Sequence, residues 1–162
     1  SSEITTRSDT SGYVEVELVQ SAIYDVVVEG REDEVFFVKV PSALSCNITE
    51  LIWPYTASVT LGSTTASVAA GSEVEVSASA VLSSGLTLPY RDQNDSLVGS
   101  SSYLTVKSSK ESVATVEISG EKVSITGVSA GSAVISFTPV ESWEKRMPAV
   151  SVTLGTITVT VT

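Results

Sequence analysis

The chain contains no histidine and a single cysteine, Cys46. Without histidine it cannot form a Ser-His-Asp triad, a Cys-His pair or a histidine-bearing zinc site. One cysteine cannot form an intrachain disulfide, and it supplies too few thiolates for a cysteine-rich zinc site. We therefore expect no catalytic residue, no bound metal, no cofactor and no enzymatic activity. We expect Cys46 to be a small buried or half-buried residue rather than a nucleophile.

Lysine and arginine are also scarce. Together they number nine, against 19 aspartates and glutamates, which gives a net charge of −10. Binding to nucleic acids and to anionic membranes depends on basic residues, so we expect no nucleic-acid partner. No stretch approaches the 18 apolar residues of a membrane-spanning helix, and we expect no membrane insertion. The acidity indicates solubility.

The first residues lack the features of a signal peptide, because residues 1–4 have neither a basic start nor an apolar run. We expect one of three explanations. A signal was removed, or the chain is a fragment, or the protein is made in a cytoplasm and displayed without secretion, as virion proteins are.

Aromatic residues make up only 6% of the chain, while hydrophobic residues make up 42%. Valine, threonine, serine and alanine dominate the sequence. β-Branched side chains pack well on pleated surfaces, and no long window places apolar residues at helical spacing. The composition therefore predicts an all-β protein with a real hydrophobic core.

The first 40 residues predict an arm followed by three strands. Residues 1–12 are polar and indicate an N-terminal arm. Residues 13–19 alternate apolar and polar side chains, which predicts a half-buried strand with Val14, Val16 and Leu18 on one face. Strands are also expected at 24–29 and 34–40, joined by a turn.

Ser8–Val16 and Tyr24–Val26 resemble the second half of a transthyretin-like or carboxypeptidase-regulatory-like β domain. The resemblance implies a partial β unit with its connector at residues 13–56, and that family's first strands would lie before residue 1. About 45 residues bury too little surface to fold alone. We therefore expect this unit to pack on the rest of the chain, or to be completed by another chain or an upstream segment.

The connector at residues 41–57 predicts one helical turn, capped by Asn47 or Thr49 and ended by Pro54. Its aromatic residues, Trp53 and Tyr55, have two interpretations. The first is that they wedge between the two halves of the chain. The second is that they form an exposed contact for a sugar or a protein.

From residue 57 onward, short β segments recur at regular spacing with turn signals between them, which is typical of a sandwich. Ser108–Val116 and Gly127–Phe137 resemble the signature of the bacterial immunoglobulin-like domain, group 2. The resemblance covers residues 57–162 and implies an immunoglobulin-like β-sandwich that spaces or displays something on a surface. The chain departs from the family where a tryptophan is usual, at Leu104 or Val106, and in longer segments at 86–103 and 138–149.

The loop at 141–148 carries the most distinctive candidate contact residues, Trp143, Arg146 and Met147. A tryptophan beside an arginine is typical of a contact anchor, although this tryptophan could also fold back over the end of the sandwich. Residues 92–96 place oxygen ligands at alternate positions. They predict an ordinary polar loop, with a calcium loop as the alternative.

Together these patterns predict a non-enzymatic structural or display module of a larger surface assembly. Its partners would be other protein subunits, and we expect an oligomer. We expect a phage virion component such as a tail, fibre or capsid decoration, located at the virion surface. The alternatives are a bacterial cell-surface adhesin or spacer, located extracellularly, and a carbohydrate-binding accessory domain whose partner is a cell-surface glycan. Residues 1–12 and the edges of the 13–40 unit are the expected attachment surfaces.

Overall fold

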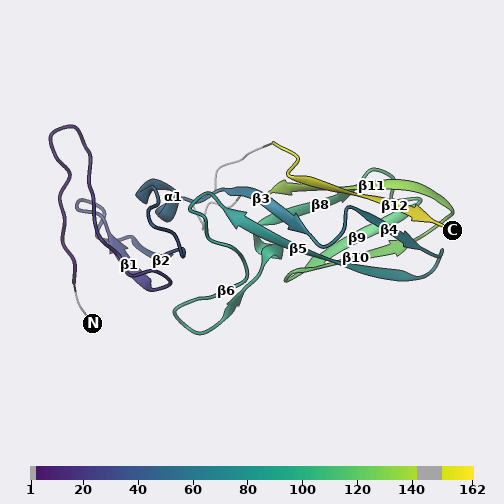
Figure 1. Cartoon of the computed structure of the whole chain (residues 1–162), viewed down its shortest axis with the longest axis horizontal. Coiled ribbons are helices and arrows are strands. Elements are labelled where there is room, and N and C mark those ends of the chain that lie inside the picture. The colour runs from purple at the N-terminus through teal and green to yellow at the C-terminus, as the bar shows by residue number, and fades with distance from the viewer. Residues whose placement is uncertain (1–2, 142–150) are drawn as a thin grey trace.

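The computed structural model describes residues 3–141 and 151–162, which form an all-β protein with two parts. A small N-terminal unit reaches to residue 52, and a β-sandwich follows it. Figure 1 shows the two parts end to end, with the small unit in purple and the C terminus at the far end of the sandwich. The prediction of an all-β fold is confirmed.

One sheet of the sandwich contains four antiparallel strands. Its spatial order is β3 (Thr56–Leu61), β5 (Glu73–Leu82), β10 (Lys122–Gly127) and β9 (Ala114–Ser119). Strands β9 and β10 form the predicted hairpin, in which Lys122 pairs with Ser119. Edge strands β3 and β9 therefore border this sheet.

The second sheet also contains four strands. Its order is β4 (Thr65–Val68), β12 (Gly155–Val161), β11 (Gly131–Pro139) and β8 (Leu104–Ser108). Strands β8, β11 and β12 are antiparallel, whereas β4 runs parallel to β12. Since β3 and β4 are consecutive in the chain but lie in different sheets, the first strand of the sandwich is divided between the two sheets.

The topology of the two sheets identifies the type of sandwich. We letter β3 and β4 as A and A′, and β5, β8, β9, β10, β11 and β12 as B to G. One sheet then has the order A-B-E-D and the other A′-G-F-C. This is the immunoglobulin arrangement. The prediction of an immunoglobulin-like sandwich with a smaller N-terminal β unit is confirmed.

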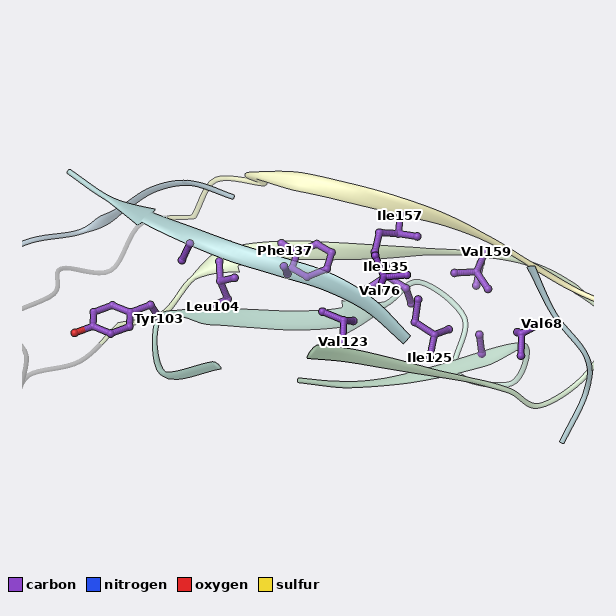
Figure 2. Close-up of a cluster of buried hydrophobic side chains, with 14 of the residues drawn as sticks. Val68, Val76, Tyr103, Leu104, Val123, Ile125, Ile135, Phe137, Ile157 and Val159 are labelled. Carbon is purple, nitrogen blue, oxygen red and sulfur yellow. The ribbon is translucent and has the colours of Figure 1, made fainter. Parts of the chain in front are cut away.

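The core of the sandwich lies between the two sheets, as Figure 2 shows. Phe137, Ile135 and Ile157 from one sheet face Ile125 and Val123 from the other, and all five side chains are fully buried. Each strand buries alternate residues, because successive side chains point to opposite faces of a sheet. Burial of each such side chain stabilises the fold by about 1.5–3 kcal/mol.

Two glycines in the segment with the immunoglobulin-like signature have a steric role. A Cβ atom at Gly127 would lie 2.6 Å from the carbonyl oxygen of Ala69. The backbone of Gly127 exchanges hydrogen bonds with Gly71 and Ser72, at 2.8 and 2.9 Å. Gly131 has a φ of 153° and lies against Val113. These positions admit no larger side chain without a shift of the neighbouring backbone or side chain.

The segment between β5 and β8, which includes the longer segment noted at residues 86–103, has some regular structure. It contains the short strands β6 (Tyr90–Arg91) and β7 (Leu97–Val98) and the 3₁₀ turn η1 (Ser100–Ser102). Ser100 is fully buried and joins two elements. Its hydroxyl accepts from the amide of Ala80, and its amide donates to a carboxylate oxygen of Glu121, at 2.9 and 2.6 Å.

The N-terminal unit contains a two-stranded antiparallel sheet and one helical turn. Strands β1 (Ile23–Val27) and β2 (Val35–Lys39) are joined by the predicted turn, in which Gly30 has a φ of 86°. Helix α1 (Ile48–Ile52) follows. The side chain of Asn47 accepts from the amide of Thr49 at 2.8 Å, as the capping prediction required. Phe36, Val38 and Leu51 are the buried residues of this unit's cluster.

One predicted strand is wrong. Residues 13–19 are extended but belong to no strand, although Val14, Val16 and Leu18 are partly buried as the pattern predicted. A period of two reports which side chains are half-buried, but a strand also needs a neighbouring chain to pair with.

Candidate interaction surfaces

The N-terminal segment turns back on itself at residues 9–12. One oxygen of Asp9 accepts from the amides of Ser11 and Tyr13, at 2.8 and 3.0 Å, and from the Ser11 hydroxyl at 2.6 Å. Gly12 closes the turn with a φ of 84°. The Ser11 hydroxyl, followed by the backbone amides of Tyr13, Ser11 and Gly12, lowers the pKa of the Asp9 carboxyl below its usual value.

The segment after this turn has unpaired backbone groups. No amide or carbonyl of Val14–Leu18 is hydrogen-bonded to another described residue. The side chains nevertheless alternate, since Val14, Val16 and Leu18 are partly buried while Glu15 and Glu17 are exposed. This combination of a strand-like side-chain pattern with free backbone groups is that of an unpaired edge.

An open groove of about 750 Å³ runs beside this segment. One wall is formed by residues 12–18, and the other by residues 40–41, 43–49 and 51. Backbone groups of the second wall are also largely unpaired: between residues 41 and 46, only the carbonyl of Ala43 is bonded, to the Gln20 side chain at 2.8 Å. The groove therefore lies between two segments, residues 14–18 and 41–46, whose backbone groups are largely unpaired among the described residues.

The whole N-terminal unit is strongly acidic. Residues 3–52 contain ten aspartates and glutamates and three basic residues, which gives a net charge of −7. One of these basic residues, Arg31, is paired with Glu34 at 2.6 Å. No lysine or arginine lines the groove among the residues that the structure describes. The unit therefore presents a negative potential to an incoming partner.

A second concavity, of about 330 Å³, lies where the two parts meet. Phe37, which is 55% exposed, lines it from β2, and Leu86, Tyr90 and Tyr103 line it from the sandwich. Figure 2 places Tyr103 at one end of the sandwich core, with its hydroxyl pointing away from the other core residues. Burial raises the pKa of the Tyr103 phenol, and the adjacent Tyr90 raises it further.

The connector between the two parts is anchored to the turn after β5. The amide of Tyr55 donates to the Ser83 hydroxyl at 3.1 Å, and the Tyr55 carbonyl accepts from the Ser83 amide at 2.8 Å. Next along the chain, the Thr56 hydroxyl donates to the Tyr103 carbonyl at 2.7 Å and is buried. These bonds fix the point at which the N-terminal unit leaves the sandwich.

The two aromatic residues predicted as contacts in the connector, Trp53 and Tyr55, lie in different surroundings. The ring of Trp53 packs edge-on against Phe36, with centroids 5.7 Å apart, and belongs to the small core of the N-terminal unit. Tyr55 is 37% exposed. Trp53 is thus packed within its own unit rather than wedged between the two. A role for Trp53 or Tyr55 in partner binding stays a prediction.

The other predicted contacts, Trp143, Arg146 and Met147, lie outside the described residues. Cys46 was expected to be buried or half-buried, and this prediction is wrong because its side chain is exposed. It lies in the extended segment before α1, which no other element covers in the described structure. The unpaired segment Val14–Leu18 was predicted only as an ordinary strand, and its alternating pattern was the signal that located it.

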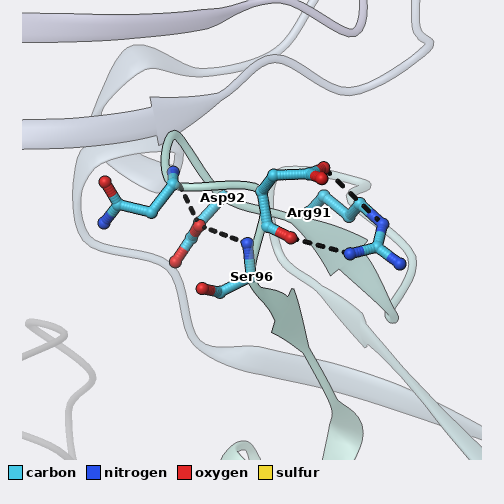
Figure 3. A network of polar contacts seen from close by, with 5 residues as sticks. Arg91, Asp92 and Ser96 are labelled. Carbon is cyan, nitrogen blue, oxygen red and sulfur yellow. Dashed lines mark hydrogen bonds and ion pairs between the residues drawn. The ribbon is translucent and has the colours of Figure 1, made fainter.

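The loop at residues 92–96 forms a network within itself, shown in Figure 3. Asp92 accepts from the amides of Asn94 and Ser96, both at 2.9 Å. Arg91 donates to the carbonyl of Asp95 at 2.7 Å and lies 3.8 Å from its carboxylate. This geometry is that of the ordinary polar loop. Among the described residues, no group of three or more potential metal-binding side chains comes together.

None of the helices in the described residues has the length and apolar character needed to cross a membrane.

Comparisons with known proteins give structural neighbours only. No family model matches the chain, and no curated protein matches it. Solved structures of the S-layer protein SbsC are similar to it. Its domains 4 and 5 are 19% identical with a TM-score of 0.44, and the match covers 81% of this chain and 60% of that one. Its domains 5–6 are 21% identical with a TM-score of 0.43, and the match covers 67% and 45%.

The chain therefore spans less than two thirds of the length of these structures. Similarity at this level carries no conclusion about function. The resemblances to the group 2 and transthyretin-like families, and the domain boundaries at 12, 56 and 57 that follow from them, stay predictions.

Proposed function

We propose that this chain is a non-enzymatic structural module of a larger surface assembly, and that its N-terminal unit contacts neighbouring protein subunits. One observation carries the proposal. A sandwich of two four-stranded sheets bears at one end a small acidic unit, whose segment Val14–Leu18 has a strand pattern but no backbone partner among the described residues.

The sandwich supplies the rigid part of this module. Its strands are joined by continuous ladders, such as the seven-residue pairing of β11 with β12. Its core residues interdigitate between the two sheets. Paired strands around a dry core resist bending, which suits a spacer that holds two attachment points apart.

The N-terminal unit supplies the attachment. It lies at the end of the molecule opposite the C terminus (Figure 1). Its exposed apolar side chains include Tyr13, Val19, Val35 and Phe37, at 46–67% exposure. Free backbone groups and exposed apolar side chains are the features that neighbouring subunits cover in an assembly.

We place the assembly at a bacterial cell surface, where the chain would serve as a spacer or adhesin domain, and keep the phage virion as the alternative. The solved structures reported above are of a surface-layer protein, which is compatible with a cell surface. At a cell surface or on a virion, the N-terminal unit would make the same contact with a neighbouring subunit.

The test compares the full chain with a variant that lacks residues 1–12. Both are expressed with an epitope tag in the organism that makes the protein, and their retention in the cell envelope and in sedimenting particles is measured. We expect the full chain in the envelope fraction and the deletion variant released into the medium. Circular dichroism should show that the sandwich of the variant remains folded.

Three results would change this proposal. Equal retention of the two forms would exclude residues 1–12 from the contact. Recovery of the full chain in phage-sized particles would favour the phage virion over the bacterial cell surface. A freely secreted, monomeric full chain would contradict the assembly role altogether.

A further inference from the structure

We propose that the groove between residues 12–18 and 40–51 accepts an extended, basic segment of a different protein subunit, which pairs with Val14–Leu18 as an added strand. The inference rests on the proposed function, because it supplies the partner that the N-terminal unit would contact. It assigns the binding site and the chemistry of the occupant.

The backbone of the groove favours a strand rather than a helix or a loop. Val14–Leu18 is extended, and none of its amides and carbonyls has a partner among the described residues. Strand addition pairs such groups and thereby gives affinity without a preformed side-chain pocket. The seven residues that form this wall extend over roughly 20 Å, which fits an incoming strand of about six residues.

The side chains of the groove select the pattern of the occupant. Val14, Val16 and Leu18 are partly buried toward the unit, and Ile48 and Leu51 line the opposite wall. An added strand that alternates apolar and polar residues would continue this apolar face, because side chains of paired strands share the same period of two.

The charge of the groove selects the polar residues of the occupant. Glu15 and Glu17 are exposed at alternate positions on the free segment. None of the described residues that line the groove is basic, and residues 3–52 around it carry a net charge of −7. Opposite charges on adjacent strands stabilise pairing, while like charges destabilise it. The complementary strand therefore carries lysine or arginine at alternate positions.

A second copy of this chain fits that description poorly. Its net charge is −10, so two copies repel each other. None of the strands in the described residues carries two basic side chains, and the extended residues 3–8 contain one glutamate and one arginine. The occupant is therefore a subunit of a different kind, with a more basic segment.

The first experiment uses the purified full chain and a blocked peptide that alternates valine and lysine. Affinity is measured by fluorescence anisotropy at physiological salt, and hydrogen exchange of individual amides is measured by NMR. We expect binding together with at least tenfold slower exchange in Val14–Leu18, while edge strands β8 and β9 of the sandwich stay unchanged. Absence of binding, or protection of a sandwich edge instead, would overturn the proposal.

A peptide of the same composition with its lysines and valines in separate blocks controls for nonspecific attraction to an acidic protein. We expect at least tenfold weaker binding. Equal affinity of the two peptides would show that charge alone acts, and that no strand is added.

A charge reversal sharpens the test. In the variant Glu15→Lys with Glu17→Lys, the valine–lysine peptide should lose at least tenfold in affinity, and a valine–glutamate peptide should now bind. The matched control, Glu73→Lys with Glu117→Lys, changes the net charge equally but on exposed positions of the sandwich. An equal loss of affinity in both variants would contradict the assigned site.

Light scattering on the purified chain alone tests whether a second copy of the chain occupies the groove. A dimer in which the amides of Val14–Leu18 are already protected from exchange would show that a second copy fills the groove, and would overturn the inference. The two proposals can fail separately. If the peptide binds as expected but the full chain is not retained at the cell surface, the surface role fails while the strand-binding groove stands.

Discussion

The sandwich and the N-terminal unit use the same kinds of residue but differ in how they are stabilised. In the sandwich, 18 buried hydrophobic residues form one cluster between two four-stranded sheets. In the N-terminal unit, a cluster of three buried residues supports a two-stranded sheet and one helical turn. A hairpin of two strands is marginal in water unless further strands or a helix cover it.

The difference teaches where each part obtains its stability. Each sandwich strand pairs with at least one neighbouring strand and contributes side chains to a common core. Contacts elsewhere in the domain therefore compensate for a weak contact in one strand. The N-terminal unit relies on few side chains, and it leaves the backbone of Val14–Leu18 and most of the backbone of residues 41–46 unpaired among the described residues. A low-stability region with unpaired backbone is where binding segments are found. The following changes probe this contrast.

The largest effect is expected in the sandwich core, from Phe137→Ala. Phe137 is fully buried, and its truncation leaves a cavity among residues of both sheets. We expect the free energy of unfolding to fall by about 3–5 kcal/mol, measured by urea denaturation with circular dichroism. Val134→Ala is the matched control on the same strand, because Val134 is 37% exposed. A loss of similar size in both variants would show that the core is not close-packed.

Phe36→Ala should unfold the N-terminal unit alone. Phe36 is 8% exposed and packs against Trp53, so its loss removes one of the three buried residues of the unit's hydrophobic cluster. We expect the fluorescence of Trp53, in a Trp143→Phe background, to move to that of an exposed indole. Sandwich stability should change by less than about 0.5 kcal/mol.

Phe37→Ala is the control for this change, since Phe37 is adjacent but 55% exposed. It should leave the Trp53 spectrum unchanged. If Phe36→Ala also lowers the stability of the sandwich substantially, the two parts fold as one unit and the contrast between them is wrong.

Gly127→Ala should destabilise the sandwich by about 1–3 kcal/mol, because the added methyl group meets the Ala69 carbonyl at 2.6 Å and forces the turn to shift. The measurement is thermal unfolding followed by circular dichroism. Thr160→Ala, on the exposed face of β12, serves as the control and should be close to neutral. An unchanged melting temperature in Gly127→Ala would mean that this turn is free to move.

The smallest effect concerns pH and the Asp9 turn. Hydrogen bonds to Asp9 lower its pKa in the folded chain, so the ionised form stabilises the turn. That stabilisation is present above the unfolded value of 3.8 and is lost as the pH falls through the folded pKa. The NMR shifts of the Ser11 and Tyr13 amides should follow this titration, while those of β11 and β12 stay constant. In Asp9→Asn the same amides should not titrate, and a persistent titration would exclude Asp9 as its source.

Much of the fold was predictable from local pattern. The pattern of residues 24–40 predicted β1, β2 and the turn that joins them, and the regular spacing of short β segments from residue 57 onward predicted the sandwich. The Asn47 cap and Pro54 predicted α1. These features depend on interactions between residues close in the chain, and so they are visible in the sequence.

The errors arose where distant contacts decide the outcome. Residues 13–19 have a strand's side-chain pattern, but Val14–Leu18 form no backbone hydrogen bond with any described residue. Trp53 had two interpretations, a wedge between the two parts or an exposed contact, and it packs against Phe36 within its own unit. Cys46 was expected to be at least half-buried, but the path of the connector leaves it exposed.

The sequence by itself determined the fold class, most strand positions and the acidic character of the N-terminal unit, because composition, periodicity and charge are properties of the chain. Only the tertiary structure decided that β3 and β4 join different sheets, that Ser100 links β5 to the β9–β10 turn, and that Val14–Leu18 faces an open groove. Each of these depends on which distant segments meet, and that choice is made by the packing of the whole core rather than by any local pattern.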